Sequence, residues 1–206
     1  MNNKFLTKTK ESDILELAEN IDIKWPKQNN YLDRETSFIY EMENLQDLNT
    51  ICNMLHVSDK IRNYAMHRWF NYVISKAYED EFHQCGAVPV ENYKDSDKDF
   101  YIDGTPYDLK VTVLSERYDG APIDTEEGKK EYIKWLYENQ SRQQRYHTKN
   151  RLFLVCNGET KRDALIQKAN IAKNMQKVKE YVKSYKPMEV ELSSGKTVYS
   201  DIILAN

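Results

Sequence analysis

Residues 99–113 have the sequence DFYIDGTPYDLKVTV, in which two strand-like runs flank the dipeptide Asp103-Gly104. An Asp-Gly pair between such runs is a strong signal for a β-hairpin with a two-residue turn. This turn fixes the register of the two strands, so that Asp99 should face Asp108. One face of the hairpin is then apolar and belongs in a core, and the other carries every charge outside the turn. The apolar face comprises Phe100, Ile102, Tyr107, Leu109, Val111 and Val113, and the charged face comprises Asp97, Asp99, Tyr101, Pro106, Asp108, Lys110 and Thr112.

Helical and strand-like segments follow one another on both sides of this hairpin. Residues 10–56 have a helical spacing of apolar residues, and Ser58 is a suitable N-cap for a helix over 59–82 that ends by Gly86. Asp124 and Glu127 have the spacing of a capping box for a helix that reaches about His147. The sequence then predicts a buried strand over 151–157, a helix over 160–185, and a hairpin of 188–192 and 197–204. This order predicts an α/β fold with a mixed β-sheet flanked by helices.

The chain has 206 residues, of which 40% are hydrophobic and 31% charged, and this composition is enough to bury one core. We divide it into a helical N-terminal segment, residues 1–58, whose role the sequence does not assign, and a domain of residues 59–206, expected to form one compact unit. No apolar run reaches the length of about 18 residues that a membrane span requires, and the first residues are polar. We therefore expect a cytoplasmic protein with no membrane partner. The three cysteines are far apart in sequence, which is typical of reduced thiols and not of a zinc site.

Charge is distributed unevenly along the chain. Residues 1–141 contain 17 basic and 27 acidic residues, whereas residues 142–186 contain 12 basic and 3 acidic residues. A cationic segment beside an acidic remainder suits a protein that holds a polyanion with one surface and a divalent cation with another. A solvated lysine-rich helix face would give the same composition, so the motifs have to distinguish the two interpretations.

The facing residues Asp99 and Asp108 have the chemistry of a cation site. They fall at a non-hydrogen-bonded position of the hairpin, where facing Cα atoms lie roughly 4.5 Å apart. Carboxylates at that separation can share a cation such as Mg²⁺ or Mn²⁺, and they repel each other without it. Replacement of Asp108 by alanine is therefore expected to leave folding intact and to relieve repulsion. Lys110 lies on the same face, where its ammonium group can assist a metal-bound water or neutralise charge on a phosphate.

The spacing of Asp99 and Asp108-Leu109-Lys110, together with the helix before the hairpin, resembles the motif of the PD-(D/E)XK nuclease superfamily. This resemblance implies a restriction-endonuclease-like fold and magnesium-dependent cleavage of DNA. It assigns Asp99 and Asp108 as catalytic acids and metal ligands, and Lys110 as the catalytic lysine. The main-chain carbonyl of Leu109 is a further candidate metal ligand.

Two positions of the motif stay open in the sequence. The preceding helix should supply a catalytic glutamate, for which Glu79 is preferred and Glu81 is the alternative. Lys98 stands where the motif has proline, which leaves Asp97 as an alternative to Asp99 for the first acid.

A basic segment, residues 140–151, contains no acidic residue. Arginine, lysine, amide and histidine side chains are the groups that bind phosphates or read the edges of bases. The segment leads into a strand expected in the same sheet as the hairpin, so its end should lie near the charged face. The alternative is that these cations only complement the dipole at a helix C-terminus. The residues predicted to contact DNA are Arg142, Gln143, Arg145, His147, Lys149 and Arg151.

These observations together predict a metal-dependent endonuclease that hydrolyses phosphodiester bonds in double-stranded DNA, with Mg²⁺ as cofactor and Mn²⁺ as a substitute. Among known classes the prediction is closest to a type II restriction enzyme. A structure-selective repair or recombination nuclease is an alternative with the same chemistry, and a non-catalytic DNA-binding module that retains the fold is an alternative from another class. A homodimer is expected if the protein cuts both strands of a two-fold symmetric site.

Overall fold

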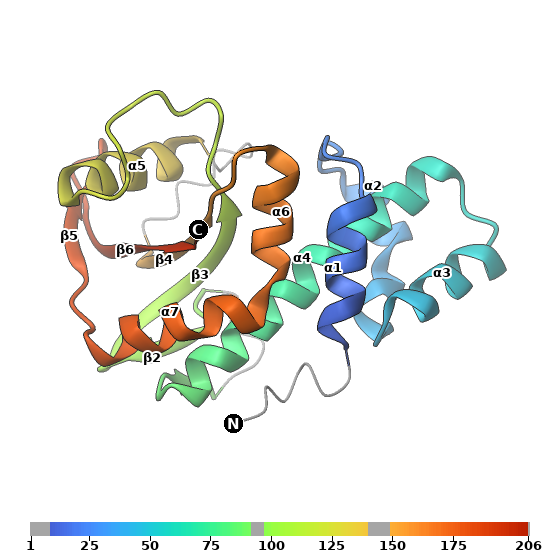
Figure 1. The fold of residues 1–206 in the computed structure, drawn as a ribbon, viewed down its shortest axis with the longest axis horizontal. Helices are drawn as coiled ribbons and strands as arrows, with labels where there is room; N and C mark the ends of the chain where they lie inside the picture. The colour runs from blue at the N-terminus through green and yellow to red at the C-terminus, as the bar shows by residue number, and fades with distance from the viewer. Residues whose placement is uncertain (1–8, 92–96, 140–148, 206) are drawn as a thin grey trace.

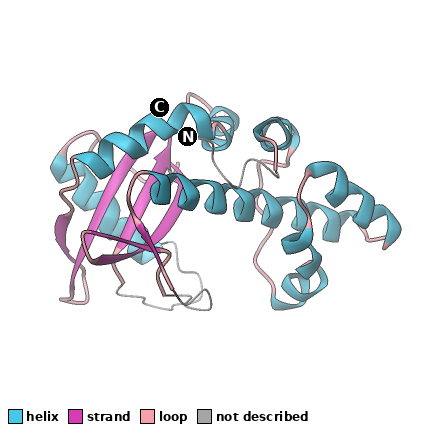
Figure 2. Ribbon diagram, turned by 90° about the horizontal axis from the view of Figure 1, so that it is seen from below, coloured by secondary structure: helices cyan, strands magenta, loops and turns pink. Residues whose placement is uncertain are grey.

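The computed structural model describes residues 9–91, 97–139 and 149–205, and its N-terminal part is helical (Figure 1). The helical character predicted for residues 10–56 is confirmed, and this segment contains several short helices. They precede the long helix α4, which runs from the N-terminal helices to the sheet (Figure 2). The elements are α1 (Glu11–Asn20), α2 (Asn30–Glu35), the 3₁₀ helix η1 (Ser37–Glu41), α3 (Leu45–Met54) and α4 (Asp59–Gln84).

Helix α4 begins and ends where the sequence predicts. The side chain of Ser58 accepts a hydrogen bond from the Ile61 N–H and so caps the first turn. Gly86 follows the last turn with a φ of 109°, a left-handed conformation that glycine adopts without strain. The helix spans 26 residues, so it is long enough to contact both the N-terminal helices and the sheet.

Six strands of the described residues form one mixed sheet in the order β1-β2-β3-β4-β6-β5. Strands β3, β4 and β6 are parallel to one another, and the remaining neighbours are antiparallel. The predicted α/β class with a mixed sheet flanked by helices is confirmed. The strands are β1 (Val88–Pro89), β2 (Phe100–Ile102), β3 (Thr105–Val113), β4 (Arg151–Cys156), β5 (Met188–Glu191) and β6 (Thr197–Ala205).

The β2–β3 hairpin has the predicted turn and register. Asp103 and Gly104 have φ angles of 47° and 78°, as a two-residue turn of the favoured hairpin type requires. Strand β2 pairs with β3 from Ile102 opposite Thr105 to Phe100 opposite Tyr107. The pairing stops there, so Asp99 lies outside the strand and does not form the expected cross-strand pair with Asp108.

Helices cover both faces of the sheet. On one face α4, α6 (Lys161–Ala169) and α7 (Ile171–Lys183) pack on side chains that include Tyr107, Leu109 and Leu152. On the other face α5 (Glu126–Asn139) packs on side chains such as Phe153 and Ile202. The first of these cores also contains buried residues of α1 and α3, so the N-terminal helices and the sheet share one core.

Two helix boundaries differ from the sequence prediction. Helix α5 is capped by Thr125 instead of Asp124, because the Thr125 hydroxyl accepts the Gly128 N–H at 3.0 Å. The single helix predicted over 160–185 is two helices, separated at Asn170, whose side chain accepts the Lys173 N–H and caps α7. Residues 140–148, over which α5 was predicted to continue, lie outside the described residues. No helix in the described part of the chain is long and apolar enough to cross a membrane.

Candidate active site

Asp99 lies where β2 ends beside the edge of β3. Because the strand pairing stops at Phe100, the Leu109 N–H has no cross-strand carbonyl from β2, and it donates instead to Asp99 Oδ2 at 2.7 Å. Burial raises the pKa of the Asp99 carboxyl, the Leu109 N–H opposes that rise, and the neighbouring Asp108 charge adds to it. Asp99 is therefore a partly buried acid beside a second acid.

Asp108 is held by two cations. Its side chain lies on the face of β3 that carries Lys110, and Lys110 Nζ is 2.6 Å from Asp108 Oδ1. The parallel register of β3 and β4 places Arg151 beside Asp108, and Arg151 Nε donates to Asp108 Oδ2 at 3.1 Å. The Arg151 guanidinium also stacks 5.1 Å from the centre of the Tyr137 ring. The Arg151–Asp108 pair is buried on both sides, whereas the Lys110 side chain is 40% exposed.

Helix α4 brings Glu79 to this cluster. Lys76 Nζ lies 2.6 Å from Glu79 Oε2, one turn before it on the helix. Burial raises the pKa of Glu79 against the opposing effect of Lys76, and the charges of Asp99 and Lys110 also shift it. Glu81, the alternative, lines the groove between α4 and α7 beside Lys179. The geometry therefore favours Glu79 over Glu81 as the helix acid.

The two candidates for the first acid differ in exposure. Asp97 has a side chain that is 71% exposed and forms an ion pair with Lys149. Asp99, in contrast, is oriented by a backbone N–H and influences the pKa of both Lys76 and Glu79. We therefore place Asp99 in the cluster and Asp97 outside it.

The donors for a metal ion are few. Within residues 9–91, 97–139 and 149–205, no group of three or more histidine, cysteine, aspartate or glutamate side chains is arranged to hold a metal ion. Asp99 and Asp108 each supply carboxylate oxygens. Along a strand the N–H and C=O of one residue point to the same side, so the Leu109 carbonyl points toward the side on which Asp99 lies.

The residues predicted to bind DNA are only partly within the described chain. Arg142, Gln143, Arg145 and His147 lie outside the described residues. Lys149 forms its ion pair with Asp97, which joins the start of β4 to the segment before β2. Arg151 is buried and bonded to Asp108, so its guanidinium serves the acidic cluster and not the surface.

The ion pairs change what is expected of Asp108→Ala. The sequence predicts relief of carboxylate repulsion, whereas the structure shows that the substitution would leave the buried guanidinium of Arg151 without its partner. Removal of one member of a buried pair is strongly destabilising. Sequence reasoning missed this role of Arg151, because the register between β3 and β4 depends on the whole sheet. The only signal was a basic residue at the first position of an otherwise apolar strand.

Comparison of the chain with protein-family models, with curated proteins and with solved structures finds no significant match. The functional inference therefore depends on the geometry and chemistry of the residues themselves.

Proposed function

We propose that this protein is a metal-dependent DNA endonuclease of the PD-(D/E)XK type that most resembles type II restriction enzymes. The observation that carries the proposal is the grouping of Asp99, Asp108 and Lys110 where β2 ends beside β3. Glu79, on the helix that precedes the hairpin, lies close enough for Asp99 and Lys110 to shift its pKa. Two acids and a lysine beside the end of β2, with a third acid nearby on α4, are residue types that support metal-dependent phosphodiester hydrolysis.

The donor set fits a hard divalent cation. Mg²⁺ typically takes one or two protein carboxylates and keeps several waters. Asp99, the Leu109 carbonyl and Asp108 would hold it, with Asp108 Oδ1 exchanging Lys110 for the ion. The raised pKa of Asp99, to which burial and Asp108 both contribute, indicates negative charge that a cation would stabilise. When bound, Mg²⁺ or Mn²⁺ would polarise the phosphate and lower the pKa of an attacking water.

The protein's own residues would orient the acids and balance charge. Arg151 holds Asp108 Oδ2, which leaves Oδ1 directed toward Lys110. The Lys110 ammonium can neutralise charge that develops on the phosphate oxygens during attack. Leu109, through its N–H, keeps the Asp99 carboxylate at the edge of β3. We still predict that the basic segment, residues 140–151, contacts double-stranded DNA.

The test is incubation of the purified protein with plasmid and phage DNA in magnesium, in manganese and in chelator. We expect cutting that requires the metal, is lost in Asp108→Asn, and falls on the order of 100-fold or more in Lys110→Ala. Asp97→Asn is the matched control, because Asp97 is nearby, exposed and outside the cluster. Circular dichroism of each variant checks that it folds.

The outcomes separate the candidate functions. Cutting that persists in Asp108→Asn would overturn the assignment of the site. Preferential cutting of branched or nicked DNA would indicate a repair or recombination nuclease. DNA binding without any cutting would indicate a non-catalytic module, an alternative favoured by the pairing of both Asp108 oxygens with cations.

A further inference from the structure

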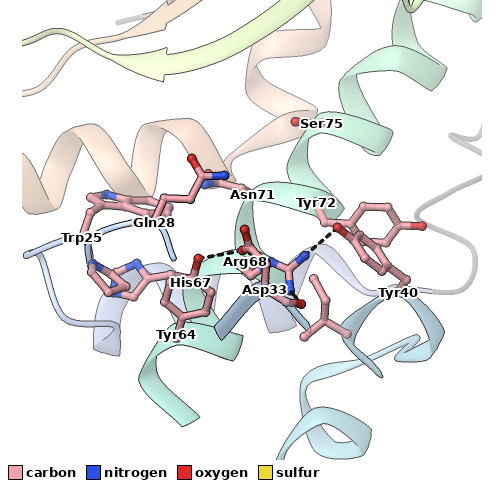
Figure 3. Close-up of a pocket in the computed structure, with 12 residues that line it drawn as sticks. Trp25, Gln28, Asp33, Tyr40, Tyr64, His67, Arg68, Asn71, Tyr72 and Ser75 are labelled. Carbon is pink, nitrogen blue, oxygen red and sulfur yellow. Dashed lines mark hydrogen bonds and ion pairs between the residues drawn. The ribbon is translucent and has the colours of Figure 1, made fainter. Parts of the chain in front are cut away.

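A cavity of 640 Å³ lies among the N-terminal helices, away from the β2–β3 hairpin (Figure 3). Its lining comes from three segments: residues 25–28, residues 33–40, and one side of α4 from Tyr64 to Ser75. Sites for small molecules typically occupy about 300–1,000 Å³. The cavity is therefore large enough for a ligand such as a nucleoside.

Aromatic rings form both ends of this cavity. At one end the rings of Trp25 and His67 lie 4.4 Å apart, and at the other the rings of Tyr40 and Tyr72 lie 5.0 Å apart (Figure 3). Trp25 is 38% exposed and Tyr40 is 53% exposed. Aromatic rings in this arrangement provide stacking surfaces for a planar ligand.

His67 provides unused hydrogen-bonding groups. It is 1% exposed, and neither ring nitrogen has a hydrogen-bond partner among the described residues. Burial lowers the pKa of His67 to about 4, so the ring is neutral near pH 7 and offers one donor and one acceptor. Buried polar atoms without partners are rare in folded proteins and costly. Because the two ring nitrogens point to opposite sides of the imidazole, the edge of a ligand in the cavity would satisfy one of them, as a donor or as an acceptor.

The charges in the cavity are already paired. Arg68 donates to the Asp33 carbonyl at 2.6 Å and to the Tyr40 hydroxyl at 2.8 Å, and its Nε lies 3.4 Å from Asp33 Oδ1. The Tyr64 hydroxyl donates to the same Asp33 carboxylate at 2.6 Å. Because the Arg68 guanidinium already has these partners, the cavity does not favour a phosphate group. It suits an uncharged planar ring whose edge carries donors and acceptors.

We infer that this cavity binds a nucleobase. Trp25 would stack on the ring, and His67 and Asn71, which both line the cavity, would bond to its edge. Asn71 would do so through its amide N–H groups, because its Oδ1 already accepts from Lys168 Nζ at 2.8 Å. Amide side chains and aromatic rings are the groups with which proteins hold bases that have left the helical stack. The base is either part of a nucleic acid or that of a free nucleoside.

The position of the cavity along α4 relates it to the acidic cluster of the nuclease proposed above, and this spatial relation rests on that proposal. His67, Asn71, Ser75 and Glu79 follow one another at intervals of four residues, so they lie along one side of α4. Twelve residues of helix separate His67 from Glu79, a rise of about 18 Å, which equals about five base steps of a DNA strand. The cavity would thus hold an unpaired base a few nucleotides from the bond that is cut.

The test measures binding in chelator, where no cutting can occur, with fluorescence anisotropy of labelled short homopolymers of dA, dC, dG or dT. A sugar–phosphate chain of equal length without bases is the reference ligand. We expect Trp25→Ala to weaken binding of at least one homopolymer by about 5- to 150-fold, the range for loss of one stacked base. Trp25→Phe should restore much of the affinity, and binding of the base-free chain should not change. Tyr31→Ala, which removes a 54% exposed ring outside the cavity, is the matched control.

A second arm titrates the four free deoxynucleosides by calorimetry. Binding of a nucleoside that Trp25→Ala abolishes would identify the free compound as the source, and binding of homopolymers alone would identify a nucleic acid. Equal binding of every homopolymer by wild type and Trp25→Ala, with no nucleoside bound, would overturn the inference. Because the assay contains no metal, a failure of the cleavage experiment leaves this result unaffected.

Discussion

Asp108 and His67 are both buried polar side chains, and they differ in how their polar atoms are satisfied. Both oxygens of Asp108 are bonded to cations, one on its own strand and one on the next strand. Neither nitrogen of His67 has a partner within the described chain. The first arrangement fixes a side chain, and the second leaves hydrogen-bonding capacity for a ligand.

His67 should make the protein less stable in acid. Its pKa is lowered by burial to about 4 in the folded protein, whereas histidine in an unfolded chain has a pKa of about 6.5. The unfolded state therefore binds more protons, and the free energy of unfolding falls by up to about 3 kcal/mol as the pH drops from about 6.5 to about 4. In His67→Phe, which keeps a ring against Trp25 but cannot be protonated, the urea midpoint should fall less over this range.

His56 is the control for this measurement, because it is exposed at the end of α3. His56→Asn, a residue that tolerates the φ of 47° at this position, should keep the acid sensitivity of the wild type. The same pH profile in His67→Phe and in the wild type would mean that His67 does not titrate between these limits.

At the scale of elements, helix ends depend on single side-chain bonds. Helix α5 follows the irregular segment after β3, and the hydroxyl of Thr125 binds the Gly128 N–H that would otherwise lack a partner. Helix α5 in turn carries Tyr137, whose ring lies against the Arg151 guanidinium. The start of this helix thus contributes to the position of the arginine that holds Asp108.

We expect Thr125→Ala to lower the free energy of unfolding by about 1 kcal/mol, because it removes this cap. Asp124→Ala changes the neighbouring residue, which the sequence pattern favours as the cap, and should have a smaller effect. Chemical denaturation of both variants provides the comparison. A larger loss of free energy of unfolding for Asp124→Ala than for Thr125→Ala would indicate that Asp124 is the cap, as the sequence predicted.

The elements that sequence predicted correctly are those set by local signals. The Asp103-Gly104 turn fixes the register of β2 and β3, and Ser58 and Gly86 fix the ends of α4. Local signals also predicted correctly that Lys110 lies on the same face of β3 as Asp108. They could not reveal Arg151 as a partner of Asp108, which requires the pairing of β3 with β4, or the cavity, whose walls come from three separate segments.

At the scale of the whole molecule, the N-terminal helices and the sheet are joined through α4, α6 and α7. Arg162 of α6 donates to the Ile21 carbonyl after α1 at 2.7 Å, and the Glu11 carboxylate of α1 accepts the Ala172 N–H of α7. The core that holds Ile14 and Trp69 continues to Leu109 and Ala205. The aromatic cavity and the acidic cluster therefore belong to one packed body, with α4 contributing to both.

This packing predicts that damage to α1 weakens the sheet as well. Ile14 is fully buried in the shared core, so Ile14→Ala should lower the free energy of unfolding by about 2–5 kcal/mol. Hydrogen exchange read by mass spectrometry should show the loss equally in peptides from α1 and from β4, because a cooperative unit opens as a whole. Met54→Ala, at a 69% exposed position of α3, should change neither peptide. Loss of protection in residues 9–56 alone would mean that the N-terminal helices unfold separately, and the base-binding cavity could then open without disturbing the acidic cluster.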